Sequence, residues 1–96
     1  MFVVSVGYVS SLDEVDLLLE DHVNFLKKQY EKGIFIVSGR KVPRTGGVIL
    51  AKAKSKKELE GILHQDPFYI KGIADYQITE FVASMTLPEL SDLCEI

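Results

Sequence analysis

The stretch FVVSVGYVSSLDEVDLLLEDHVNFLKKQYEKGIFIVSG, residues 2–39, decides the fold because it holds a strand, a long helix and a second strand in succession. Its first part alternates β-branched and aromatic residues, which is typical of a strand. Ser11 stands three residues before Glu14, a capping box that predicts a helix start. Apolar residues then recur at spacings of three and four as far as Gly33, a typical helix stop. We therefore predict strands over 2–9 and 34–39 and a helix over 12–32.

The second half of the sequence predicts a hairpin strand, a short helix and a last strand. Turn-forming residues at 43–47 separate the second strand from an apolar run at 48–51, so these two strands should form a hairpin. Ser55 and Glu58 form another capping box before a short amphipathic helix. Pro67 ends that helix and leaves Asp66 as a candidate cap for a fresh turn through 68–71. A last strand over 74–82 follows.

The order βαββαβ predicts an α+β, ferredoxin-like domain, an antiparallel sheet with both helices on one face. We assign residues 1–83 to this domain and 84–96 to a C-terminal tail. Both sheet faces read as apolar, and helices can cover only one, so we expect a homodimer packed sheet to sheet. One predicted face holds Val3, Val9, Phe35, Val37, Ile49 and Ala51. The other holds Phe2, Val4, Val6, Ile34, Ile36, Val48 and Leu50.

The composition and net charge of the chain disfavour some classes of binding partner. The chain has 96 residues, is 47% apolar, and carries a net charge of −3 without a clustered basic surface. We therefore expect neither nucleic acid nor a membrane as a partner. The single cysteine, Cys94, excludes an internal disulfide and fits a reducing compartment, and the start of the chain does not resemble a signal peptide. A cytoplasmic protein is the default expectation.

His22 is the first candidate for chemistry, because the helical spacing places it among inward-facing leucines. Asp66 lies four residues after Ile62, on the inward side of its own helix, so the two side chains could converge. A carboxylate bonded to an imidazole fixes its tautomer and raises its basicity, as proton transfer requires. The structural alternatives are a buried neutral histidine and a helix-capping aspartate. One carboxylate oxygen could cap while the other faces His22.

Other polar residues give weaker signals. Ser38 and Gly39 end the second strand, where a backbone can approach a ligand, although a bulge explains them as well. Arg40, Lys41 and Arg44 could hold a carboxylate or phenolate, or could belong to a solvated loop. His64 is expected on the surface. The sequence contains no zinc, EF-hand, phosphate-loop or dinucleotide pattern, so no metal and no cofactor are implied.

Four short motifs together resemble the YciI-like, YCII-related family over about residues 2–82. They are Glu20-Asp21-His22, Ser38-Gly39, Pro43-Arg44-Thr45-Gly46-Gly47 and Gln65-Asp66-Pro67-Phe68. The resemblance implies a dimeric α+β barrel with His22 and Asp66 as an acid–base pair facing a small pocket. It further implies that Arg44, Gly46, Gly47, Pro67 and Phe68 belong to the pocket rim or its support.

Three functions follow from these residues. The leading hypothesis is a cofactor-independent lyase or isomerase with His22 as general acid or base, Asp66 as its orienting carboxylate, and Arg44 holding an anionic or aromatic substrate. Ser38, Gly39, Pro67 and Phe68 complete the predicted binding residues. The alternative is a non-catalytic domain that binds a small ligand or serves as an accessory to another protein. A haem-degrading monooxygenase is disfavoured because it would leave Asp66 unexplained.

Overall fold

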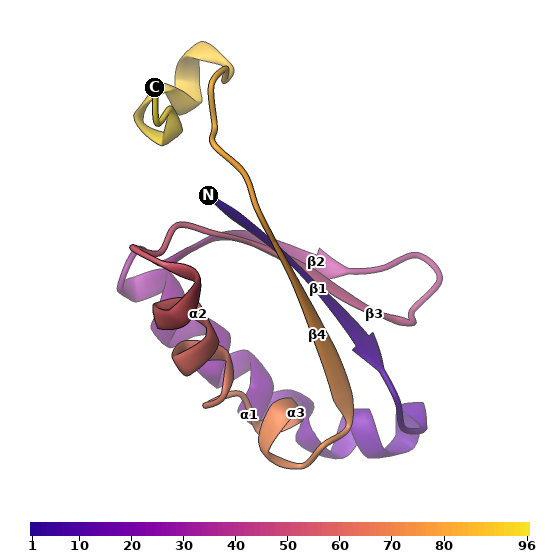
Figure 1. Ribbon diagram of the computed structural model, residues 1–96. Coiled ribbons are helices and arrows are strands. Elements are labelled where there is room, and N and C mark those ends of the chain that lie inside the picture. Colours follow the sequence, from indigo (N-terminus) through magenta and orange to yellow (C-terminus); the bar gives the residue numbers. More distant parts are fainter.

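The computed structural model describes residues 1–96 and contains one four-stranded antiparallel sheet with its helices on one face (Figure 1). The strand order is β2-β3-β1-β4, which confirms the ferredoxin-like prediction. The elements are β1 (Phe2–Tyr8), α1 (Leu12–Glu31), β2 (Phe35–Arg40), β3 (Gly46–Ala51), α2 (Lys56–Leu63), α3 (Pro67–Ile70), β4 (Ala74–Glu80) and a 3-10 segment, η1 (Pro88–Leu93).

Both capping boxes form the helix starts that their sequences predict. The Ser11 hydroxyl accepts a hydrogen bond from the Glu14 amide at 3.3 Å, and Ser55 accepts one from the Glu58 amide at 3.1 Å. Two boundaries differ from the prediction by two residues: β4 ends at Glu80 rather than at 82, and β3 begins at Gly46 rather than at Val48 because Gly46 pairs with Gly7 of β1. A Cβ at Gly46 would collide with the Val6 carbonyl, so only glycine allows this approach.

The core lies between the sheet and the helices. The strand register corrects the predicted grouping of the two faces: Ile49 pairs opposite Val4, and both are buried on the helix side. Alternation along one strand reveals which residues share a face, but not which face of a neighbouring strand they join. The core includes side chains from both layers: Phe2, Val4, Phe35 and Ile49 from the sheet, and Val15, Phe25, Leu59, Leu63 and Phe68 from the helices.

The opposite face of the sheet is apolar on one half only. Val3 pairs opposite Leu50, and Val37 also pairs with Leu50 after a bulge that shifts the register between Phe35 and Val37. Val37 and Val48 are 57% and 41% exposed. On the β4 side the same face carries Asp75, Gln77 and Thr79, so the second apolar face is smaller than the sequence predicts.

The chain beyond β4 extends away from the sheet before it turns back through η1 (Figure 1). Glu95 closes this tail, since its carboxylate accepts hydrogen bonds from the Ala83 amide at 2.8 Å and from the Met1 amino group at 2.9 Å. These bonds, the Ala83 amide first, lower the pKa of Glu95. None of the helices has the length and apolar character that a membrane crossing needs.

Candidate functional site

Asp66 is the centre of the candidate site. It follows α2 and caps α3, where its Oδ1 accepts a hydrogen bond from the Phe68 amide at 3.0 Å. Pro67 at the first helical position suits this turn, because its missing amide proton would have no partner there. The side chain of Asp66 is completely buried. A buried carboxylate needs several donors, and the surrounding elements supply them.

His22 supplies the second donor to Asp66. Its Nδ1 lies 2.8 Å from Asp66 Oδ1, so α1 and the start of α3 are joined through their side chains. The His22 ring also stacks on the Phe68 ring, with centroids 3.9 Å apart and planes 5° from parallel. A neutral imidazole that donates from Nδ1 leaves Nε2 as the nitrogen able to accept a proton.

Tyr76 of β4 is the third donor, and the sequence analysis did not identify it. Its hydroxyl donates a hydrogen bond to Asp66 Oδ2 at 2.6 Å. Burial, and then this bond to Asp66, raise the pKa of Tyr76, so the phenol remains a donor over the ordinary pH range. The available signal was alternation, since Tyr76 lies on the same strand face as the buried Ala74.

The hydrogen-bond partners of the two Asp66 carboxylate oxygens also differ from the prediction. We expected one oxygen to cap the helix and the other to meet His22. Instead, Oδ1 accepts from both the Phe68 amide and His22, and Oδ2 accepts from Tyr76. The phenol therefore fixes the carboxylate from the sheet side while the helices fix it from the other.

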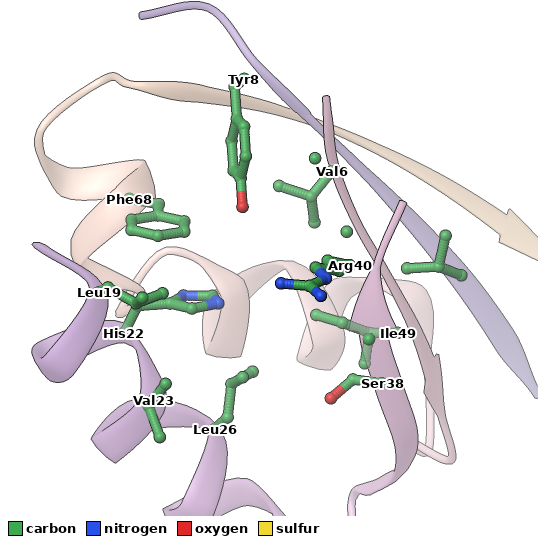
Figure 2. Close-up of a pocket in the computed structure, with 14 residues that line it drawn as sticks. Val6, Tyr8, Leu19, His22, Val23, Leu26, Ser38, Arg40, Ile49 and Phe68 are labelled. Atoms are coloured by element: carbon green, nitrogen blue, oxygen red, sulfur yellow. The ribbon is translucent and has the colours of Figure 1, made fainter. Parts of the chain in front are cut away.

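A cavity of about 270 Å³ lies beside His22, between α1 and the β2–β3 hairpin (Figure 2). The Tyr8 hydroxyl, the His22 ring and the Arg40 guanidinium point toward one another across it (Figure 2). Its walls are mostly apolar. The lining residues are Val6, Tyr8, Leu19, His22, Val23, Leu26, Ser38, Gly39, Arg40, Gly46, Gly47, Val48, Ile49 and Phe68.

The predicted binding residues divide between this cavity and its surroundings. Ser38, Gly39 and Phe68 line the cavity, and the Ser38 hydroxyl is hydrogen-bonded to the Tyr30 hydroxyl at 2.5 Å. Pro67 does not line it and instead begins α3.

The two nearby arginines differ in position. Arg44 is outside the cavity lining and donates a hydrogen bond to Asp16 Oδ1 at 2.6 Å. This bond raises the pKa of Arg44. The arginine that lines the cavity is Arg40, which follows Gly39 at the end of β2. The hairpin thus presents one arginine to the cavity and pairs the other with α1.

The chemistry open to this arrangement is proton transfer. An imidazole with one nitrogen bonded to a buried carboxylate and the other free can accept or donate a proton at the cavity. No cluster of three His, Cys, Asp or Glu side chains lies close enough to hold a metal ion. The donors around Asp66 are all side chains or amides of the chain itself.

Comparison with known proteins agrees with this fold. The family model described as the YCII-related domain matches residues 1–82. A solved structure, 5-chloro-2-hydroxyhydroquinone dehydrochlorinase from Burkholderia phenoliruptrix in complex with 2,5-dihydroxybenzoquinone, superimposes with a TM-score of 0.74. It is 18% identical, and the alignment covers 85% of this chain and 93% of that one. No protein with a curated description matches the sequence.

Proposed function

Since this chain belongs to the YCII-related domain family, we propose that it is a small enzyme of the lyase or isomerase kind in which His22 acts as the general acid or base. The observation that carries this proposal is the 2.8 Å contact between His22 Nδ1 and the buried Asp66, made directly beside a cavity. Burying a carboxylate costs free energy. A role in orienting a catalytic base would explain why the chain buries one at this position.

In the proposed reaction, Asp66 holds the His22 ring so that Nε2 acts on the substrate. Nε2 removes a proton from the substrate, and the electron pair left behind forms a new double bond. In an elimination the leaving group departs as an anion, whereas in an isomerisation His22 returns the proton at another atom. Tyr76 keeps the carboxylate oriented through Oδ2 while the imidazole becomes positively charged.

The cavity favours a small aromatic or anionic substrate. Its volume of about 270 Å³ suits a single ring, and its apolar walls and the Phe68 ring suit a planar one. Arg40 is placed to hold an oxyanion, while the contribution predicted for Arg44 would require it to leave Asp16. The fold neighbour's ligand, 2,5-dihydroxybenzoquinone, has this chemistry and makes a suitable first probe.

We further propose that two copies pair through the exposed faces of their sheets. The support is the apolar half of that face, where Val37 and Val48 remain substantially exposed in a single chain. Sedimentation equilibrium at micromolar concentration should find a dimer, and Val37→Glu should shift it toward monomer. A stable wild-type monomer would contradict this pairing.

The proposed function is tested with binding and turnover measured separately. The full chain is titrated with 2,5-dihydroxybenzoquinone, and chloride release is followed with 5-chloro-2-hydroxyhydroquinone as a candidate substrate. We expect binding in wild type and, for a substrate that fits, turnover that His22→Ala removes. Equal turnover in His22→Ala would exclude His22 as the base. A set of small aromatic anions that bind and are all recovered unchanged would favour a non-catalytic binding domain.

A further inference from the structure

A second cavity, of about 470 Å³, lies between α2, α3 and β4. Its volume falls within the range of about 300–1,000 Å³ that is usual for small-molecule sites. The proposed reaction uses none of its space. The lining residues are Glu60, Leu63, His64, Tyr69, Ala74, Asp75, Tyr76, Gln77 and Ile78.

Aromatic rings form one wall of this cavity. His64 stacks on Tyr69, with ring centroids 4.3 Å apart, and Tyr69 meets Tyr76 edge to face at 6.1 Å. Tyr69 is 43% exposed although its ring is large and apolar. An exposed aromatic wall beside a cavity offers π-electron density to a ligand.

The charges around the two cavities are opposite in sign. The second cavity is lined by the acidic residues Glu60 and Asp75 and by neither lysine nor arginine, although the side chain of Asp75 belongs to the opposite face of the sheet. The first cavity is lined by Arg40 and by no carboxylate. A ligand suited to the second cavity therefore carries positive charge, because an anion would be repelled there.

We propose that this second cavity is a binding site for a small organic cation, such as a quaternary ammonium group, held against the tyrosine rings. Cation–π attraction and the Glu60 carboxylate act together, and the methyl groups of such a cation fit the apolar floor formed by Leu63 and Ala74. This site is independent of the proposed enzymatic function, since nothing in it depends on proton transfer at His22.

Tyr76 links the new site to the His22 region. Its ring lines the second cavity, while its hydroxyl donates to Asp66, which in turn bonds His22. A cation that displaces or polarises the Tyr76 phenol alters the hydrogen bond to Asp66 Oδ2. Binding in the second cavity therefore changes the hydrogen-bonding environment of the His22 ring.

The test compares choline with its uncharged analogue of the same shape, 3,3-dimethylbutan-1-ol. Each is titrated into the full chain at millimolar concentration, and backbone and histidine ring resonances are followed by NMR. We expect choline to shift the resonances of His64 and Tyr69 saturably and to bind about tenfold or more tightly than the alcohol. Absence of saturable shifts with choline, or equal binding of the alcohol, would overturn the cation site.

Four variants, one of them a control, locate the site and its link to His22. Tyr69→Leu and Glu60→Gln should each weaken choline binding, whereas Ile70→Ala, at an exposed neighbouring position outside the cavity lining, should not. Tyr76→Phe keeps a ring in the cavity but removes the hydroxyl, so choline should still bind while the shift at His22 disappears. Normal binding in Tyr69→Leu would overturn the assigned wall. A His22 response that persists in Tyr76→Phe would overturn the route through Tyr76.

Discussion

The two histidines of the chain stack on consecutive rings of α3, Phe68 and Tyr69, yet only one of them meets a carboxylate. His22 stacks on Phe68 and bonds the buried Asp66, and 14% of its side chain is exposed. His64 stacks on Tyr69, the next residue, but is exposed and makes no hydrogen bond to an acid. Ring stacking alone therefore does not define a proton-transfer site; the buried carboxylate does.

The difference arises from the turn between α2 and α3. Asp66 is placed there by the need to cap α3, and the cap directs its carboxylate inward, toward α1 and β4. His64 ends α2 on the outer side of the same turn. A capping residue has thus become the shared hydrogen-bond acceptor for three elements, and removing it should erase the difference between the two histidine environments.

Asp66→Ala should have the largest effect on stability. It leaves the His22 ring, the Tyr76 hydroxyl and the Phe68 amide without their acceptor, so we expect a loss of about 3–5 kcal/mol in the free energy of unfolding. Urea denaturation followed by circular dichroism measures this loss. Asp21→Ala, at an exposed position of α1, is the matched control and should change stability little. A loss below about 1 kcal/mol for Asp66→Ala would mean that water replaces the carboxylate easily.

His22→Ala should have the next largest effect, on turnover. General acid–base catalysis contributes about 100-fold or more, so the rate with any identified substrate should fall by at least that factor. The control is Asn24→Ala, an exposed position two residues along α1 that does not line either cavity. If both variants retained the wild-type rate, His22 would be no different from a structural histidine.

Tyr76→Phe should cost less, because it removes one donor and keeps the partly buried ring. We expect about 1–2 kcal/mol of lost stability, since Asp66 Oδ2 loses its partner. If the proposed function is right, the rate should also fall while binding of the aromatic ligand changes little, because Tyr76 does not line the first cavity. Stability equal to that of the wild type would argue that the 2.6 Å bond contributes nothing.

The raised pKa of Tyr76 gives the same bond a pH dependence. In the unfolded chain a tyrosine ionises near pH 10, whereas the folded phenol holds its proton to higher pH. The unfolded state therefore loses its proton first, and the stability present below about pH 10 is lost as the pH rises further. Urea unfolding at several alkaline pH values should show this fall, and Tyr76→Phe should show less of it. Parallel profiles for the two proteins would contradict the assignment.

Substitutions of the two hairpin arginines should have the smallest effects on stability. The Arg44–Asp16 pair is partly exposed, so Arg44→Gln should change the free energy of unfolding little. Arg40→Gln is expected to weaken binding of 2,5-dihydroxybenzoquinone more than Arg44→Gln does, because Arg40 lines the cavity. The reverse order of affinities would restore Arg44 as the anion-holding residue.

Local signals in the sequence predict most of the fold. The capping residues Ser11 and Ser55 mark the helix starts, and alternation marks the strands. The relative register of the strands was not predictable, because pairing between distant segments decides it. For this reason the sequence grouped Ile49 with Val3, whereas the structure buries Ile49 with Val4.

The candidate site was predictable to the extent that helical periodicity and capping could place its residues. Inward spacing and the Asp-Pro cap brought His22 and Asp66 together in the prediction, and the structure joins them at 2.8 Å. Tyr76 was missed because its role depends on how β4 packs beneath α3. The choice between Arg40 and Arg44 depends on the exact end of β2 and on the Asp16 contact, which no local pattern encodes.

The most direct test of the His22–Asp66 pair is the tautomer of the His22 ring, read from its nitrogen resonances by NMR near neutral pH. We predict a protonated Nδ1 with a slowly exchanging proton and an unprotonated Nε2, while His64 in the same spectrum shows the averaged tautomers of an exposed imidazole. Asp66→Asn should disturb the first pattern and leave the second. If His22 instead gave the same averaged pattern as His64, the carboxylate would not orient the ring, and the proposed chemistry would be contradicted.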